Sequence, residues 1–278
     1  MTGARVLRNG PNKQIPRSVP RLRSGQARDD KQGVVACIGI DLAWSERNPS
    51  GLALLHFDPR RGSIELLETC CLQKDNEILH WVQDRRRSVT VLGIDAPLIA
   101  PNPAGTSRAG DRQLTRAFGR FHAGTYPANR SKCVRPIHLR KKLERLGFNP
   151  NPTAAPRQAG SWQLEVFPHP AQVVLFKLPR ILKYKKGPAA ARRAGLEQLA
   201  AHIQRDLPRL RPRLVLNSAL RQLCRLPSFL RGRALKDRED QLDALVCGYV
   251  AAYYWRWGGQ RCQVFGDVRK GYIVCPVR

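Results

Sequence analysis

The segment Val34-Val35-Ala36-Cys37-Ile38-Gly39-Ile40-Asp41-Leu42-Ala43 decides the fold. It is a run of small and β-branched residues interrupted by one acid, Asp41, a pattern typical of a central strand that is buried on both faces. The run from Val89 to Ile94 repeats the pattern and is followed by Asp95. Two buried strands that each end on an acid predict an α/β fold with its ligand site at the carboxyl ends of the strands.

Two more predicted strands and one helix lie between these runs. Leu52 to Phe57 and Ile64 to Thr69 are bounded by turn-forming residues, so the first three strands are expected to be antiparallel. The pattern over 75–87 predicts a helix with Asp75 as its N-cap. This βββαβ order predicts that the fourth strand lies parallel to the first, across a helical connection.

Residues 162–167 predict a fifth strand, which completes a mixed five-stranded sheet flanked by helices. Between strands four and five, residues 96–160 form an insertion rich in proline and glycine, a common place for substrate-binding loops. Short helices are expected within it over 111–120 and 136–146.

The remainder of the chain divides into a basic tail and a helical C-terminal part. Residues 1–32 carry few apolar residues and no periodicity, which predicts a disordered basic tail, and residues 33–278 form the expected domain. A basic helical segment spans about 171–235, and 236–257 is the clearest helix. Short strands are expected at 262–265 and 272–275.

Charge is the outstanding feature of the composition. The 278 residues include 49 Lys and Arg against 21 Asp and Glu, a formal net charge of +28. The tail contributes +6 of this, with eight basic and two acidic residues, so +22 belongs to residues 33–278. Such an excess indicates a polyanionic partner, most simply nucleic acid, with DNA and RNA both open.

Several other classes of protein are excluded or disfavoured. No run of about 18 uncharged apolar residues exists, so neither a transmembrane helix nor a membrane partner is expected. The eight cysteines are scattered without a CxxC pair, which disfavours zinc ribbons and secreted disulfide scaffolds. No apolar stretch of a secretory signal is present, and we expect reduced thiols and a cytoplasmic location.

Acidic residues are scarce, and their positions are informative. Asp41, Asp95 and Glu165 each lie at or near the end of a predicted buried strand, where an unpaired carboxylate would be costly. On the last helix Asp237, Asp240 and Asp243 are spaced i, i+3, i+6 and share one face.

Carboxylates from several elements are the ligands that Mg²⁺ or Mn²⁺ prefers. Two such ions about 3.5–4 Å apart would activate a water and stabilise the leaving oxygen in phosphodiester cleavage. No His or Cys nucleophile is obvious, which fits a metal-bound water as the attacking group.

Each acid also has a structural interpretation. Asp41 can cap a turn, Asp95 can begin a loop, and Glu165 can face solvent from within its strand. Asp237 and Glu239 lie near the beginning of a helix, where acids interact favourably with the helix dipole. The hypothesis of a shared site depends on the combination of these residues.

Five segments resemble the family catalogued as domain of unknown function 429 (DUF429), predicted nucleases of the ribonuclease H-like superfamily. The resemblance extends over about residues 35–255 and leaves the tail outside. It is carried by Gly39 to Ala43, Gly93 to Leu98, Ser107 to Leu114, Glu165 to His169, and Asp240 to Leu245.

The resemblance implies a ribonuclease H-like fold with Asp41, Asp95 and Asp243 as metal ligands. It implies that Asp240 lies beside them and that Glu165 is a further active-site acid. The Asp-x-x-Asp-Ala pattern that begins at Asp240 is similar to that of Holliday-junction resolvases of the same superfamily, which often have Glu where Asp95 stands.

Basic and aromatic residues supply candidates for substrate binding. Arg108 and Arg112 lie in the insertion, and Arg108 can bind a phosphate through two hydrogen bonds or form a surface ion pair with Asp111. His169 can shuttle protons or simply occupy a turn. Candidates for stacking on unpaired bases are Trp44, Trp162 and Tyr184, although core packing is the better prediction for Trp162.

The sequence leaves three candidate functions open. The first is a divalent-metal-dependent nuclease that works with two metal ions. The second is a nucleic-acid-binding protein that keeps the fold without catalysis. The third is a phosphotransferase of related fold, which is disfavoured because the chain has neither a duplicated half nor a glycine-rich phosphate loop after the first strand.

Overall fold

The computed structural model describes residues 33–277, and the predicted tail lies outside the described residues. The strands are β1 (Val35–Asp41), β2 (Ser50–Asp58), β3 (Ser63–Leu72), β4 (Val89–Asp95), β5 (Gly160–Glu165), β6 (Arg213–Leu214), β7 (Cys262–Asp267) and β8 (Gly271–Pro276). The α-helices are α2 (Asp75–Asp84), α3 (Ala109–Phe118), α4 (Val134–Arg145), α5 (Pro168–Leu175), α6 (Ala189–Asp206), α7 (Ser218–Cys224) and α8 (Gly232–Trp257).

The central sheet is mixed, with the strand order β5-β4-β1-β2-β3-β6. β1, β2 and β3 are antiparallel, and β4 lies parallel to β1 across the α2 connection, as the sequence predicted. β5 is parallel to β4. The predicted count of five strands is wrong, because the two residues of β6 pair with Ser63 and Ile64 of β3. So short a strand, next to prolines in a basic segment, carries no periodic signal.

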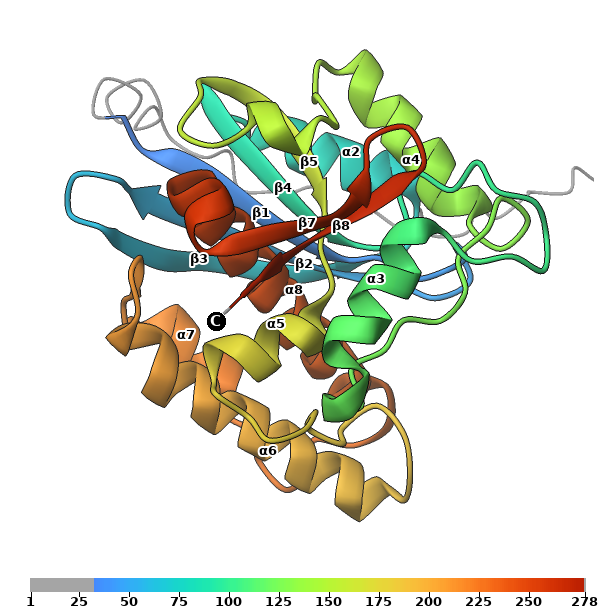
Figure 1. Ribbon diagram of the computed structural model, residues 1–278. Helices are drawn as coiled ribbons and strands as arrows, with labels where there is room; N and C mark the ends of the chain where they lie inside the picture. The colour runs from blue at the N-terminus through green and yellow to red at the C-terminus, as the bar shows by residue number, and fades with distance from the viewer. Residues whose placement is uncertain (1–32, 278) are drawn as a thin grey trace, which may run out of the picture.

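Helices cover both faces of this sheet (Figure 1). α2 and α4 lie on one face, over a core that includes Ala36, Ile38 and Ile40. α8 lies along the other face, with α5, α6 and α7 outside it, over a core that includes Val35 and Cys37. The alternation of neighbouring β1 side chains between two cores is the physical reason for its unbroken apolar sequence.

α8 lies directly against the backbone of the sheet. A Cβ atom added to Gly39 would overlap the Ala244 carbonyl oxygen of α8, and one added to Gly93 would overlap the Cys247 carbonyl oxygen. On the helix side, a Cβ at Gly248 would collide with Leu55. We call this contact the glycine seam. Because only glycine permits so close an approach, the seam fixes the depth of α8 on the strands.

The insertion contains α3 and α4, close to the predicted helices, and the C-terminal strands form the β7–β8 hairpin. Asp75 is not the N-cap of α2 as predicted; Lys74 occupies that position. The Asp75 carboxylate is instead buried, paired with Arg135 Nε at 2.9 Å and Lys142 Nζ at 3.2 Å. This ion pair joins α2 to α4.

Two further predictions concern cysteines and membranes. All eight cysteines are free thiols, in agreement with the scattered spacing. Among the described residues, no helix combines the length and the hydrophobicity that a membrane crossing requires.

Candidate functional site

Asp41 and Asp95 lie side by side at the carboxyl ends of β1 and β4. They are register partners in the parallel pair, two positions beyond the partners Gly39 and Gly93. Side chains two residues apart on a strand share a face, so both aspartates lie on the α8 side of the sheet. Both acids therefore lie where the sequence predicted them, at the carboxyl ends of neighbouring parallel strands.

α8 brings two more carboxylates to the same place. The backbone of Asp240 lies against Gly51 of β2, and a Cβ on that glycine would overlap the Asp240 carbonyl. The Asp240 carboxyl lies close enough to the Asp41 carboxyl for the two to interact electrostatically. Asp243 lies one turn further along and is completely buried. We call Asp41, Asp95, Asp240 and Asp243 the acid cluster.

A lysine lies within the acid cluster. The Lys185 Nζ is 2.8 Å from Asp243 Oδ2 and 4.0 Å from Asp41 Oδ2, so it lies between an acid of the helix and an acid of the sheet. The adjacent Tyr184 donates its hydroxyl to Asp243 Oδ1 at 2.7 Å. Gln172 of α5 also donates to Oδ1, at 3.3 Å. Asp243 Oδ2 accepts no hydrogen bond of good geometry within the described chain, so its contact with Lys185 is an ion pair only.

Burial dominates the electrostatics of the acid cluster. It raises the pKa of Asp41 and raises that of Asp95 well above its usual range, although the Lys185 charge opposes both shifts. Burial, followed by repulsion from Asp41, raises the pKa of Asp240 to about 7. These carboxyls are held in an environment that penalises their negative charge and that a bound cation would relieve.

Two ammonium groups balance part of this charge. Lys236 Nζ lies 2.6 Å from Asp240 Oδ1 and 2.7 Å from Glu239 Oε1. Burial lowers the pKa of Lys185, but Asp243 and Asp41 outweigh it and raise that pKa well above its usual range, so the ammonium stays charged. Asp95 forms no ion pair within 4.0 Å inside residues 33–277. The four acids of the cluster thus outnumber the two lysines that contact them.

Glu165 does not join the acid cluster, contrary to the sequence prediction. It pairs in register with Ile94 of β4, and Ile94 belongs to the core under α2 and α4. Its carboxylate therefore lies on the opposite face from Asp95. There it accepts hydrogen bonds from Arg108 Nη1 at 2.8 Å, Arg108 Nη2 at 2.6 Å and the Leu98 backbone at 2.9 Å.

Arg108 is likewise buried. Its guanidinium is 1% exposed and also contacts Asp111 at 2.7 Å. Both predictions for Arg108, a phosphate contact and a surface ion pair, are therefore wrong. Its guanidinium donates to two buried acids and to the Ile99 carbonyl. Arg112 is exposed and hydrogen-bonded to the Ser107 carbonyl, so its side chain remains at the surface of the insertion.

The remaining candidates separate by exposure. Trp44 is 57% exposed, three residues beyond Asp41, whereas Trp162 and Tyr184 are buried and cannot stack on a base. His169 lies next to Tyr184, with ring centroids 5.5 Å apart. Burial and the nearby Lys185 charge lower the pKa of His169 to about 4, so it is neutral near pH 7.

A family model described as "Protein of unknown function (DUF429)" matches residues 39–270. The chain belongs to the DUF429 family. The match confirms the family resemblance and contains the whole acid cluster together with Lys185. No curated protein and no solved structure matches the chain.

Within this DUF429 chain, the sequence did not reveal two residues of the site, Gln172 and Lys185, and it predicted base stacking for Tyr184, which instead bonds to Asp243. Tyr184 and Lys185 lie in an irregular segment between α5 and α6, inside a run of lysines that predicts a solvated surface. Neither spacing nor composition separates Lys185 from the exposed Lys183 and Lys186. Only the tertiary structure assigns it to the acids.

The acid cluster offers the kind of donors that a divalent cation prefers. Within residues 33–277 no three His, Cys, Asp or Glu side chains converge in the arrangement of a metal site, and the Lys185 ammonium lies between Asp41 and Asp243. The chemistry of the donors nevertheless suits Mg²⁺ or Mn²⁺: all are carboxylate oxygens, and the buried Asp243 Oδ2 accepts no hydrogen bond in the described chain. The residues therefore fit a hard cation in donor type and in charge.

Proposed function

We propose that this DUF429 protein is a divalent-metal-dependent nuclease, a phosphodiester hydrolase of the ribonuclease H-like superfamily. The observation that carries the proposal is the meeting of Asp41, Asp95, Asp240 and Asp243 at one end of the sheet. They come from two parallel strands and one helix far along the chain, and the four carboxyls outnumber the two lysines that contact them.

The connectivity of the sheet supports the superfamily assignment. Three antiparallel strands are followed by a helix and by a fourth strand parallel to the first, and β5 lies outside β4. The short β6 extends this arrangement at the opposite edge.

The chemistry divides between the cation and the protein. A bound Mg²⁺ or Mn²⁺ supplies Lewis acidity and lowers the pKa of water. Asp41 and Asp95 would hold it, with Asp240 and the Lys185-paired Asp243 beside them. Tyr184 and Gln172 hold the Asp243 carboxylate in one orientation through Oδ1 and leave Oδ2 to the Lys185 ammonium. Burial of the acids keeps the local dielectric low, which strengthens every charge interaction there.

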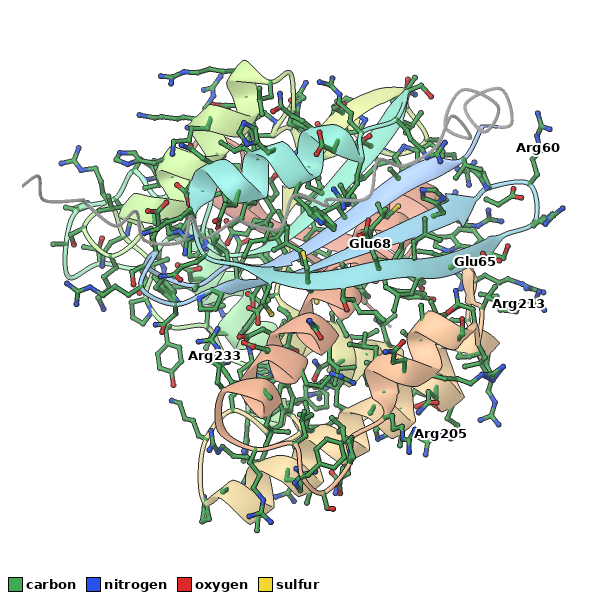
Figure 2. All side chains as sticks on the ribbon, turned by 180° about the vertical axis from the view of Figure 1, so that it is seen from behind. Arg60, Glu65, Glu68, Arg205, Arg213 and Arg233 are labelled. Atoms are coloured by element: carbon green, nitrogen blue, oxygen red, sulfur yellow. The ribbon has the colours of Figure 1, made fainter. Side chains whose placement is uncertain are left out.

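The surface of the basic helical segment, which includes Lys185, favours a polyanion. Residues 171–235 contain fifteen Lys and Arg against two acids, and most of these cations are exposed. Figure 2 shows Arg233 at the beginning of α8, on the N-terminal side of Asp240, whereas Arg205 on α6 and Arg213 on β6 lie toward the other end of the sheet, where β6 pairs with the beginning of β3. Some arginines are structural: Arg238 donates to three backbone carbonyls around α7. Arg193 is structural as well, because it donates to the Leu226, Ser228 and Leu230 carbonyls. The exposed lysines and arginines without such partners would bind phosphates and make the affinity dependent on salt.

Exposed aromatic side chains accompany these charges. Tyr126 is 72% exposed and bonded through its hydroxyl to Lys186, the residue after Lys185. Trp44 follows β1. An aromatic surface beside basic residues suits unpaired bases, because every base can stack regardless of sequence.

The test is incubation of the full chain with labelled single- and double-stranded DNA and RNA, with Mg²⁺, with Mn²⁺ and with a chelator. We expect cleavage of at least one substrate that requires the metal and that Asp41→Asn abolishes. Asp237→Asn is the matched control, since Asp237 lies outside the acid cluster and pairs with Arg233 at the beginning of α8. Tight, salt-sensitive binding without cleavage of any substrate would contradict the nuclease and support the non-catalytic binding protein.

A further inference from the structure

The position of Lys185 bears on how many metal ions the acid cluster holds. Sequence reasoning led to two ions, since two bridged ions are the usual arrangement for phosphodiester hydrolysis among carboxylates. In the structure a positive charge already bridges part of the cluster, at 2.8 Å from Asp243 and 4.0 Å from Asp41. Any second ion between these two acids would lie against an ammonium group.

Lys185 is held in place from both sides. The preceding Tyr184 is fully buried and bonded to the same Asp243 carboxylate, and its backbone lies against Gly195 of α6. The following Lys186 is bonded to the Tyr126 hydroxyl at 2.5 Å. The backbone of Lys185 therefore lies between two anchored neighbours, and its ammonium is a fixed part of the site.

The distribution of charge is uneven across the acid cluster. Lys236 neutralises Asp240, and Lys185 neutralises Asp243. Asp41 is only at the limit of ion-pair distance from Lys185, and Asp95 forms no ion pair within the described chain. The carboxyls without a close counter-charge in the described chain are thus the two at the adjacent strand ends, which share a register position.

We infer that the acid cluster takes one divalent cation, at Asp41 and Asp95, and that the Lys185 ammonium provides the second positive charge of the site. This inference rests on the proposed function for its catalytic meaning. Lys185 is a positioning residue in it: the ammonium fixes Asp243 and Asp41, and it repels a second ion from the space between them.

The test counts metal ions on the full chain. Mn²⁺ binding is measured by isothermal titration calorimetry and by the loss of the free-Mn²⁺ electron paramagnetic resonance signal, for the wild type, Lys185→Ala and Lys185→Arg. We expect one Mn²⁺ per chain for the wild type and for Lys185→Arg, which keeps the charge. Lys185→Ala is expected to bind two, because it removes the repelling charge and opens the space beside Asp243.

Two controls keep the result interpretable. Lys183→Ala removes an exposed lysine from the same segment and should still bind one ion. Lys185→Gln retains a polar side chain of similar length and replaces Lys185→Ala if thermal unfolding shows that the latter is not folded; it too should bind two ions.

The outcomes distinguish this inference from the proposed nuclease. Two ions on the wild type, or one ion on both neutral variants, would overturn the inference and leave the nuclease in place. One ion on the wild type and two on Lys185→Ala, without cleavage of any nucleic acid, would uphold the inference and overturn the nuclease. No Mn²⁺ binding by the wild type would overturn both.

Discussion

Substitution of Glu165 by Gln separates a structural acid from a catalytic one. The Glu165 carboxylate accepts three hydrogen bonds, two of them from the buried Arg108 guanidinium at 2.6 and 2.8 Å. Glutamine would keep one acceptor, turn an NH₂ group toward a donor, and leave Arg108 with Asp111 as its single acidic partner. Removing one partner of a buried pair costs about 3–5 kcal/mol of unfolding free energy.

Urea denaturation measures this cost. With a denaturant slope of about 3 kcal/mol per molar, such a loss lowers the midpoint by about 1 to 2 M without changing the slope. Burial raises the pKa of Glu165 to about 7 despite the Arg108 charge, so the experiment is run at pH 8, where the wild-type carboxylate is ionised. Because the folded state holds the Glu165 proton more tightly than the unfolded chain does, wild-type stability should fall as the pH rises toward about 7, whereas Glu165→Gln has no such group. The difference in unfolding free energy between the two proteins should therefore be larger at pH 5 than at pH 8.

Glu65→Gln is the control, because Glu65 is an exposed acid on β3 (Figure 2) and should shift the unfolding free energy by less than about 0.5 kcal/mol. A Glu165→Gln protein with the wild-type midpoint and no nuclease activity would refute the reasoning. It would mean that Glu165 is the active-site acid that the family resemblance implies.

Three further predictions follow from the site and its supports. Gly39→Ala should lower the unfolding free energy by about 1–3 kcal/mol or more, measured by urea titration, and should weaken Mn²⁺ binding, because the new Cβ overlaps α8. Gly119→Ala, with open space around it, should do neither. Mn²⁺ affinity should rise by up to about tenfold per pH unit between pH 6 and 7, because metal displaces a proton from Asp240, whose pKa burial raises to about 7. Asp240→Asn should remove this part of the rise, and an unchanged profile would contradict it. Trp44→Ala should weaken binding of single-stranded oligonucleotides in anisotropy titrations by about 1–3 kcal/mol and leave duplex binding unchanged, and equal losses on both would argue against base stacking.

The parts of the site that follow from local periodicity could be predicted from the sequence. β1 and β4 are buried on both faces, their apolar runs identify them, and parallel pairing then places Asp41 beside Asp95. The i, i+3 spacing similarly placed Asp240 and Asp243 on one face of α8. In each case one element and its neighbour were enough to fix the position of the side chain.

The rest of the site could not be predicted, because it depends on contacts between segments that are far apart in the sequence. Whether Glu165 faces α8 or α4 is set by the register of β5 against β4, and a shift of one residue would reverse it. Lys185 reaches the acid cluster only because Tyr184 and α6 hold an irregular segment against α5 and α8. No local pattern encodes such packing, so the sequence left Lys185 among the surface lysines and Arg108 among the candidate phosphate ligands.

The glycine seam has a consequence for the order in which the protein is made. Asp41 and Asp95 are synthesised early, whereas α8 begins only at Gly232, and β1 and β4 depend on that helix to cover their glycines. A nascent chain still short of α8 carries half of the acid cluster, with the backbone of Gly39 and Gly93 uncovered. Assembly of the complete cluster therefore waits for the last part of translation, and a ribosome-bound fragment that ends before Gly232 has neither Asp240 nor Asp243 to offer a metal ion.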